Sequence, residues 1–252
     1  LEERAPMSLF RAREWYRTKV GGGREEFSHG CFVVANIDNS DDGAPKIVTG
    51  SLSGYLRIHY PKGETDESAQ VMEMMLDHPV LQLECGRFSP HDPHRLCLAV
   101  LHPRRLVVYA VVVRGANLGG AFALEPLQNH ALGDPRGEHF TAFNMVSGPF
   151  GGYGSDGDDA GGGAPGDALL VQAMDGKVMV FEHGMHAFSR RLNAGGVLPG
   201  PLCYVPKVDA LVTGTADGVV ECYKYKALAE IGRADSAGSS GSSSPLPRAK
   251  GV

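Results

Sequence analysis

Residues 168–181, which read ALLVQAMDGKVMVF, decide the fold class of this chain. Two runs rich in Val, Leu and Met flank the dipeptide at Asp175 and Gly176, which supplies the positive φ that a tight β-hairpin turn needs. Three other stretches repeat the pattern: KIVTGSLSGYLRIHY (46–60), RLCLAVLHPRRLVVY (95–109) and ALVTGTADGVVECY (210–223). A hairpin that recurs four times predicts a β-propeller or a solenoid.

The spacing of the four hairpins favours a propeller. Their turns fall at Gly54, Arg104, Gly176 and Gly218, which are 50, 72 and 42 residues apart, and propeller blades repeat every roughly 40–50 residues. The long middle interval contains residues 148–167, GPFGGYGSDGDDAGGGAPGD. This segment is rich in Gly and Asp, so it is expected to form a disordered loop, and without it the blade period is restored.

Two further strands can be assigned around the second and third hairpins. Residues 80–88 and 139–146 would be inner strands, and residues 121–132 and 186–192 outer strands. The sequence therefore predicts an all-β fold, a partial WD40-like β-propeller with about four four-stranded blades. A ring of seven such blades needs roughly 300 residues or more. We expect an incomplete ring whose apolar flanks are exposed and favour association or require further sequence.

The remaining segments complete the domain prediction. Residues 1–6 would be a tag remnant or an upstream extension, residues 7–231 the incomplete propeller, and residues 232–252 a disordered tail rich in Ser, Gly and Pro.

A short amphipathic helix is expected at residues 8–18, SLFRAREWYRT, because its apolar residues recur at helical spacing. Such a helix could bind a membrane surface or a partner, or it could pack against the propeller. Its candidate interaction residues are Arg11, Arg13, Trp15 and Arg17.

Composition narrows the classes of partner. The net charge of −5 gives no bulk attraction for nucleic acid or anionic membrane. The longest apolar run, LVVYAVVV at 106–113, is far shorter than the about 20 residues of a spanning helix, so no transmembrane segment is predicted. Five cysteines without a C-x-x-C pair predict a reducing, cytosolic compartment.

One segment resembles a calcium loop. Asp38, Ser40 and Asp42 precede a Gly in D-x-S-x-D-G spacing, and calcium takes six to eight oxygen ligands on such a turn. Lys46 and Thr49 stand where integrin-type and EF-hand loops carry acidic ligands. Two readings stay open: a calcium-stabilised, integrin-like propeller for adhesion or ligand binding, or a polar turn capped by its own carboxylates.

Catalytic signals are weak. His91, Asp92 and His94 lie in a proline-containing turn without a third metal ligand. A propeller enzyme would line its channel with acid–base residues, and the predicted inner strands offer Glu84 and His139. G-x-S-x-G, H-E-x-x-H and G-x-x-x-x-G-K-[ST] do not occur. We therefore expect a protein that is not an enzyme and uses no cofactor.

Several idiosyncratic blocks point to a family. They include MSLFRAREWYRT (7–18), EEFSHGCFVVANIDNS (25–40), KIVTGSLSGYLRIHYP (46–61), DHPVLQLECGRF (77–88) and QAMDGKVMVFE (172–182). In this order the chain resembles the N-terminal propeller portion of the family of the ninth Bardet-Biedl syndrome protein, also called the parathyroid hormone-responsive family. The Gly/Asp insertion is longer than the family's loop.

This resemblance implies a seven-bladed propeller and a non-enzymatic scaffold subunit of the BBSome, a coat-like adaptor that moves membrane proteins to and from cilia. The implied partners are the other BBSome subunits and, through the complex, ciliary membrane cargo and an Arf-like GTPase. Membrane association would occur only through the complex, nucleic acid is not an expected partner, and the implied locations are the cytoplasm, cilium and basal body.

Overall fold

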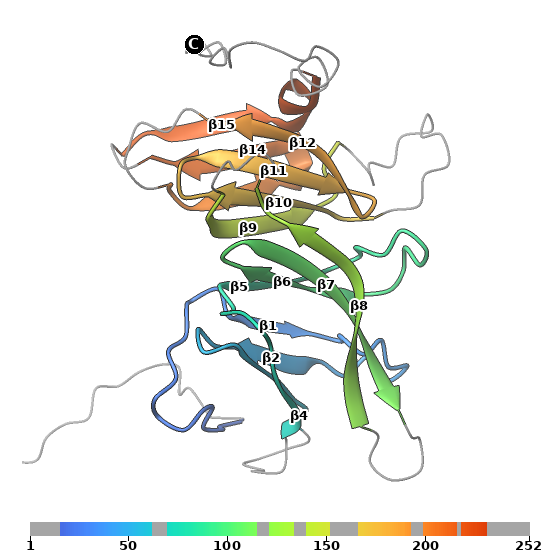
Figure 1. Ribbon diagram of the computed structural model, residues 1–252. Coiled ribbons are helices and arrows are strands. Elements are labelled where there is room, and N and C mark those ends of the chain that lie inside the picture. The colour runs from blue at the N-terminus through green and yellow to red at the C-terminus, as the bar shows by residue number, and fades with distance from the viewer. Residues whose placement is uncertain are drawn as a thin grey trace, which may run out of the picture.

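Four antiparallel sheets make up the computed structural model, and they lie one above another (Figure 1). The structure describes residues 16–61, 70–114, 121–133, 140–151, 166–192, 199–215 and 218–230. Each sheet is one propeller blade, in which the strands follow one another in chain order. The predicted fold class, a partial WD40-like propeller of about four blades, is confirmed.

The first three blades have four strands each, and the described part of the fourth has three. The first blade contains β1 (Phe32–Ala35), β2 (Lys46–Gly50), β3 (Tyr55–His59) and β4 (Gln70–Met75). The second contains β5 (Gln82–Gly86), β6 (Cys97–His102), β7 (Arg105–Arg114) and β8 (Ala121–Ala131). The third contains β9 (Ala142–Gly148), β10 (Ala168–Ala173), β11 (Lys177–Glu182) and β12 (Met185–Arg191). The fourth contains β13 (Leu202–Val205), β14 (Ala210–Gly214) and β15 (Val220–Lys224), with the 3-10 helix η2 (Pro206–Val208) between β13 and β14.

The hairpins that the sequence predicts are the two middle strands of the first three blades and the last two described strands of the fourth. Gly54, Gly176 and Gly218 have φ values of 89°, 79° and 78°, as the turn prediction requires. At Gly54 space is also limiting, because a Cβ would lie 2.8 Å from the carbonyl oxygen of Leu76.

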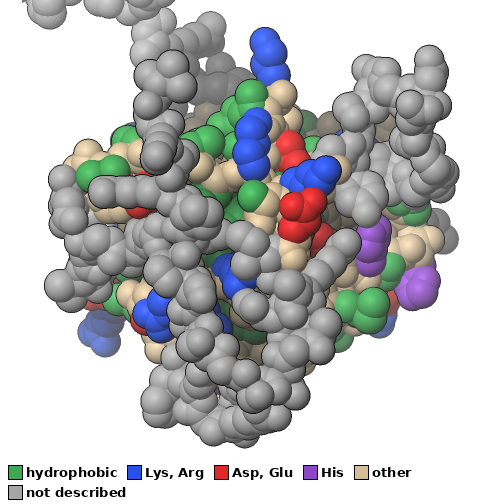
Figure 2. Space-filling view, turned by 90° about the horizontal axis from the view of Figure 1, so that it is seen from above, with side chains coloured by type: hydrophobic (Ala, Val, Ile, Leu, Met, Phe, Trp, Pro, Cys, Tyr) green, Lys and Arg blue, Asp and Glu red, His purple; other side chains and the backbone are tan. Residues whose placement is uncertain are grey.

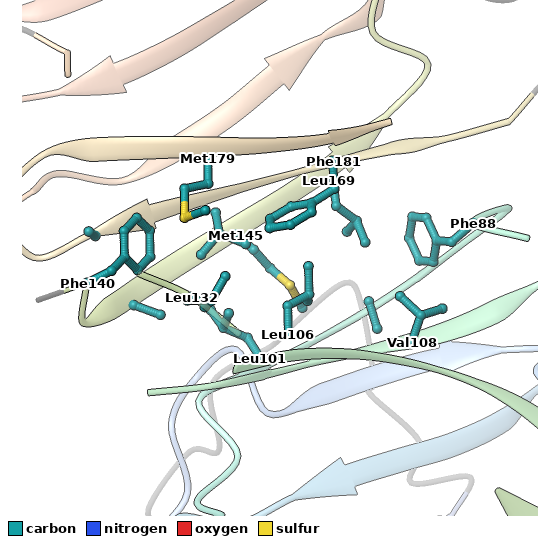
Figure 3. Packing of buried hydrophobic residues seen from close by; sticks show 14 of the residues in the cluster. Phe88, Leu101, Leu106, Val108, Leu132, Phe140, Met145, Leu169, Met179 and Phe181 are labelled. Carbon is teal, nitrogen blue, oxygen red and sulfur yellow. The ribbon is translucent and has the colours of Figure 1, made fainter. Parts of the chain in front are cut away.

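The hydrophobic core lies between the blades rather than inside one sheet. All six residues of β6 and all six of β10 are buried, because neighbouring blades cover both faces of these middle strands. Figure 3 shows the cluster between the second and third blades. Leu101 and Leu106 enter it from the second blade, and Leu169 and Phe181 from the third.

Two side-chain amides join neighbouring blades by imitating a backbone pair. The Gln82 amide nitrogen donates to the Met145 carbonyl oxygen at 2.8 Å, and the Met145 N–H donates back to Gln82 Oε1 at 2.8 Å. Asn39 pairs in the same way with Leu96, at 3.0 and 2.7 Å. These pairs tie the second blade to the third and the first to the second.

Removing one of these side-chain amides should lower the stability of the packed blades. We expect Gln82→Met to lower the free energy of unfolding by about 1–3 kcal/mol, because it leaves the Met145 backbone groups without their partner. Urea unfolding followed by circular dichroism measures the change. Asn129→Ala, at an exposed position of β8, is the control and should change stability by less than about 0.5 kcal/mol. Equal effects of the two variants would contradict the clamping role of Gln82.

Several predicted segments fall outside the described residues. Most of the expected helix at 8–18 does so, and its last residues, 16–18, are not helical. The chain there leads into a bend in which Gly21 and Gly23 have φ values of 75° and 79°, a region that glycine adopts readily. The predicted tail at 232–252 and the middle of the predicted loop also lie outside.

The ends of that Gly/Asp-rich loop are packed against the blades. Gly148 closes β9 opposite Ala168, and Phe150 is buried in the core between the third and fourth blades. At the other end, the Asp167 carboxylate accepts a hydrogen bond from the Arg87 N–H at 2.8 Å. An apolar ring and a backbone-bound carboxylate thus fix both ends of the segment.

Candidate functional site

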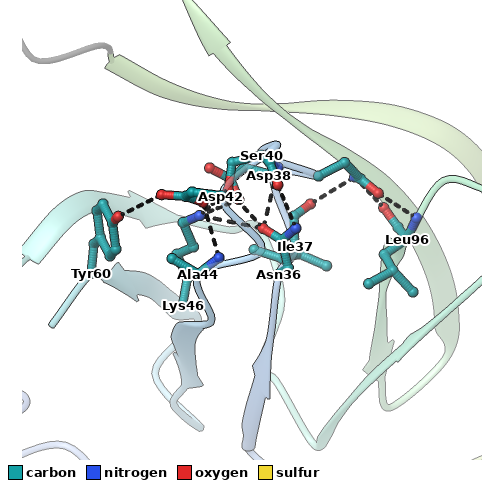
Figure 4. A network of polar contacts seen from close by, with 10 residues as sticks. Asn36, Ile37, Asp38, Ser40, Asp42, Ala44, Lys46, Tyr60 and Leu96 are labelled. Carbon is teal, nitrogen blue, oxygen red and sulfur yellow. Dashed lines mark hydrogen bonds and ion pairs between the residues drawn. The ribbon is translucent and has the colours of Figure 1, made fainter.

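The turn at residues 36–46, between β1 and β2 of the first blade, holds a network of polar contacts (Figure 4). The Lys46 ammonium lies 2.6 Å from Asp38 Oδ1, 2.6 Å from Ser40 Oγ and 3.4 Å from Asn36 Oδ1. Lys46 is only 1% exposed, and its ammonium also lies 4.8 Å from the centre of the Tyr60 ring. A cation supplied by the chain therefore sits among the oxygens that the calcium-loop reading would assign to a metal.

Asp42, the third calcium candidate, holds the outer side of the same turn. Its carboxylate accepts from Ser40 Oγ at 2.7 Å, the Ala44 N–H at 2.9 Å and the Tyr60 hydroxyl at 3.0 Å. These hydrogen bonds, that of Ser40 foremost, lower the pKa of Asp42 to about 2. The geometry matches the second reading of the sequence, a polar turn capped by its own carboxylates.

Sequence reasoning did not include Asn36 or Tyr60 in this network. The Asn36 amide donates to the Ser40 carbonyl oxygen at 2.9 Å, a turn-capping contact that an Asn four residues before a Ser could have indicated. Among the residues that the structure describes, His, Cys, Asp and Glu side chains form no group of three or more that could hold a metal ion.

Of the predicted interaction residues, Arg11, Arg13 and Trp15 lie outside the described part of the chain, and Arg17 is exposed. Glu25, which the sequence analysis did not single out, holds the described N-terminal segment to the first blade. Glu25 accepts two hydrogen bonds from the Arg57 guanidinium, both at 2.8 Å, and the Arg57 Nε donates to Glu73 at 2.6 Å.

Arg57 is 5% exposed, and its side-chain hydrogen bond lowers the pKa of Glu25 below its usual value. A planar guanidinium between two carboxylates thus joins three segments of the chain.

Glu84, the candidate channel acid, lies on β5 and is partly buried. The Gln82 amide donates to its Oε1 at 3.0 Å, and the Ser147 hydroxyl donates to its Oε2 at 3.2 Å. Loss of water on burial raises the pKa of Glu84, and these two hydrogen bonds only partly offset the increase. Its proposed companion His139 lies outside the described residues, so the structure does not bring the two together.

The raised pKa of Glu84 gives a stability prediction with a definite sign. The folded chain holds the Glu84 proton more tightly than the unfolded chain, so this carboxyl destabilises the fold increasingly as the pH rises through its folded pKa. Glu84→Gln, which does not titrate, should therefore raise the melting temperature more at about pH 8 than at about pH 4. Thermal unfolding at both pH values checks this, with the exposed Glu230→Gln as control. The same gain at both pH values would rule out titration of Glu84 as the cause.

The histidine cluster of the sequence forms a capped turn. The Asp92 N–H donates to Ser89 Oγ at 3.1 Å, and the His94 N–H donates to Asp92 Oδ1 at 3.3 Å. Asp92 thus binds the backbone of the turn, and His91 is exposed.

Apolar side chains are exposed on both outer blades. On the first blade Phe32, Val34 and Met75 are 57%, 51% and 67% exposed, and on the fourth Val220 is 73% exposed. Figure 2 views the molecule from the side of the fourth blade, where hydrophobic side chains of the described residues lie among Lys, Arg and acidic ones. No helix among the described residues is long and apolar enough to cross a membrane.

Residues 7–250 match the model of the PTHB1 N-terminal family. The chain belongs to the PTHB1 N-terminal family. Protein PTHB1 of Xenopus laevis is 41% identical over 237 residues, which cover 91% of this chain and 26% of that protein. Protein PTHB1 of Homo sapiens is 40% identical over 236 residues, 91% of this chain and 24% of that protein. The chain thus spans about a quarter of the length of these curated relatives.

A solved structure supports the propeller fold of this PTHB1 N-terminal family member. The crystal structure of Saccharomyces cerevisiae Sqt1 aligns with a TM-score of 0.52 at 13% identity, covering 81% of this chain and 47% of that one. At this identity the likeness concerns the fold alone. A crystal structure of BBS1N in complex with ARL6DN, soaked with lead, aligns at 15% identity and covers 79% of this chain and 67% of that one. Its TM-score of 0.39 is too low to support an argument about fold or function.

Proposed function

We propose that this chain is the propeller portion of a non-enzymatic scaffold subunit of the BBSome, which acts by protein–protein interaction in the trafficking of membrane proteins to and from cilia. The observation that carries the proposal is family membership: the match to the PTHB1 N-terminal family extends over residues 7–250. The sequence blocks that resemble the BBSome subunit family lie within this range.

The fold is consistent with a role in binding. Cores between the blades bury the middle strands, whereas the outer strands and turns remain at the surface. Exposed apolar side chains such as Phe32 and Val220 offer contact area on both outer blades. Glu84, the candidate catalytic acid, accepts a hydrogen bond from Gln82. Asp38, a candidate calcium ligand, is paired with Lys46.

The proposed partners are the other BBSome subunits. Ciliary membrane cargo and an Arf-like GTPase would be reached through the assembled complex, and the proposed locations are the cytoplasm, cilium and basal body. The chain spans about a quarter of the length of its curated relatives. The proposal therefore concerns only the partner contacts that this propeller portion makes.

Affinity purification from ciliated cells tests the proposal. The tagged 252-residue chain should recover the other BBSome subunits, identified by mass spectrometry. The Sqt1 propeller, expressed with the same tag, is a control of similar fold and low sequence identity. Absence of BBSome subunits, or their equal recovery with Sqt1, would refute the scaffold assignment.

A further inference from the structure

The fourth blade is the last sheet of the described stack, and one of its faces exposes apolar side chains (Figure 1). Leu211 of β14 packs toward the third blade, so the residues that alternate with it point the other way. We call that outward side of β13, β14 and β15 the front face. Its central row is Cys203, Val212 and Cys222, which lie directly opposite one another. Both cysteines are exposed, Val212 is half-buried, and Val220 beside the row is 73% exposed.

Two other blades bury the same face. When the hairpins are aligned at their turn glycines, the front-face positions Val212, Val220 and Cys222 have equivalents in the first and third blades. The equivalents are Val48, Leu56 and Ile58 in the first blade and Leu170, Val178 and Val180 in the third. Each of them is 0% exposed and belongs to the core shared with the next blade. The front face of the fourth blade therefore has the residue pattern of a surface on which another sheet packs.

The other end of the stack offers no equally open surface on its middle strands. On the side of the first blade away from the second, Thr49, Arg57 and His59 are 8%, 5% and 1% exposed. The exposed apolar residues Phe32 and Met75 of this blade lie on its edge strands, β1 and β4. Because the middle strands there are covered, we do not expect the fourth blade of one copy to dock on the first blade of another.

The central row of the front face is suited to two-fold pairing with itself. If a two-fold axis through Val212 runs along β14, Cys203 of one copy faces Cys222 of the other. If the axis runs across the strands, each cysteine faces its own counterpart. Both arrangements bring valine onto valine without a charge in the row. Lys224 lies at the margin, where its ammonium donates to the Val208 carbonyl oxygen at 2.5 Å.

We propose that two copies of this chain associate front face to front face as an isologous dimer. The contact would continue the blade-on-blade packing that joins the four sheets within each copy. Three strands of about five residues cover roughly 14 by 17 Å. This is well below the about 800 Å² that each partner contributes to a typical stable interface, so the dimer should be weak. The inference goes beyond the proposed function and concerns the purified chain alone.

Sedimentation velocity of the 252-residue chain over about 1 to 200 μM tests the association. The sedimentation coefficient should increase with concentration to that of a dimer and then level off. Val220→Lys puts a charge into the front face of both copies and should weaken association at least about tenfold. Met185→Lys is the matched control, because Met185 is 69% exposed on β12 of the third blade. It should associate like the unaltered chain.

Cysteine cross-linking is a second measurement, and it begins with the unaltered chain. A short bismaleimide should yield a covalent dimer at the concentrations where sedimentation shows association, and Val220→Lys should suppress it. If Cys203→Ser and Cys222→Ser each abolish the product, the two-fold axis runs along β14. If only the double variant abolishes it, the axis runs across the strands. Either result supports the front-face dimer.

Four results would overturn the proposal: a monomer at every concentration, assembly that continues beyond the dimer, equal weakening by Met185→Lys, or a cross-link that persists in the double cysteine variant. A monomer in which Val220→Lys reduces BBSome capture would assign the front face to a different protein, and it would equally refute pairing with a second copy. Capture of BBSome subunits together with a strictly monomeric chain would leave the scaffold function standing.

Discussion

Replacing Lys46 with Met is expected to lower the free energy of unfolding by about 3–5 kcal/mol, because the variant leaves a carboxylate buried without a counter-charge. The side chains of Lys46 and Asp38 are 1% and 6% exposed, and the ammonium lies 2.6 Å from both Asp38 and Ser40. Urea unfolding monitored by circular dichroism measures the loss. It should exceed that of the neighbouring Tyr60→Phe, which removes only the hydroxyl that donates to Asp42.

A second substitution separates the ion pair from simple packing. Asp38→Leu in the Lys46→Met background should restore part of the lost stability, because no buried charge is then left unpaired. If the two side chains act independently, the double variant should instead lose the sum of the stabilities lost in Lys46→Met and in Asp38→Leu alone. That result would show that Lys46 and Asp38 are not coupled. A rise in the melting temperature of the unaltered chain on adding calcium would contradict the role of Lys46 as the cation of this turn.

Leu101→Ala is expected to cost about 2–5 kcal/mol, since it removes a fully buried side chain and leaves a cavity between two blades. Leu101 is 0% exposed and lies directly opposite Leu106 in the hairpin of β6 and β7, where both contact the core that continues into the third blade. Urea unfolding followed by circular dichroism measures this loss in the free energy of unfolding.

Leu127→Ala is the matched control, because Leu127 lies on β8 of the same blade and is 42% exposed. It should change the free energy of unfolding by less than about 0.5 kcal/mol. Comparable losses of stability in Leu101→Ala and Leu127→Ala would show that the core cluster around Leu101 does not join the second and third blades.

The hairpins could be predicted because their determinants are local. In β10 and β11 the apolar runs and the turn at Gly176 lie within 14 residues, and the turn glycine has the positive φ that the sequence indicates. The repeat of this pattern, corrected for the insertion at 148–167, predicted the blades and their order. Phe150 was the exception: its neighbours suggested a loop, whereas the ring packs on Tyr204 and Tyr225.

The candidate sites were less accessible to sequence reasoning. Lys46 was recognised as a cation that opposes calcium, but its contact with Asp38 and Ser40 depends on the turn that brings them together. Gln82 gave no signal, because its partner Met145 is 63 residues away in another blade. His130 of the second blade and His186 of the third likewise meet at the Phe181 ring, although they are far apart in the sequence.

The sequence alone determined the four hairpins, the repeat and the family, because hairpin formation and hydrophobic patterning act over neighbouring residues. Only the tertiary structure decided which faces are buried and which polar groups meet, such as Arg57 with Glu25 and Gln82 with Met145. These pairings arise from the stacking of twisted sheets, which sets distances between residues far apart in the chain. No local propensity encodes such distances.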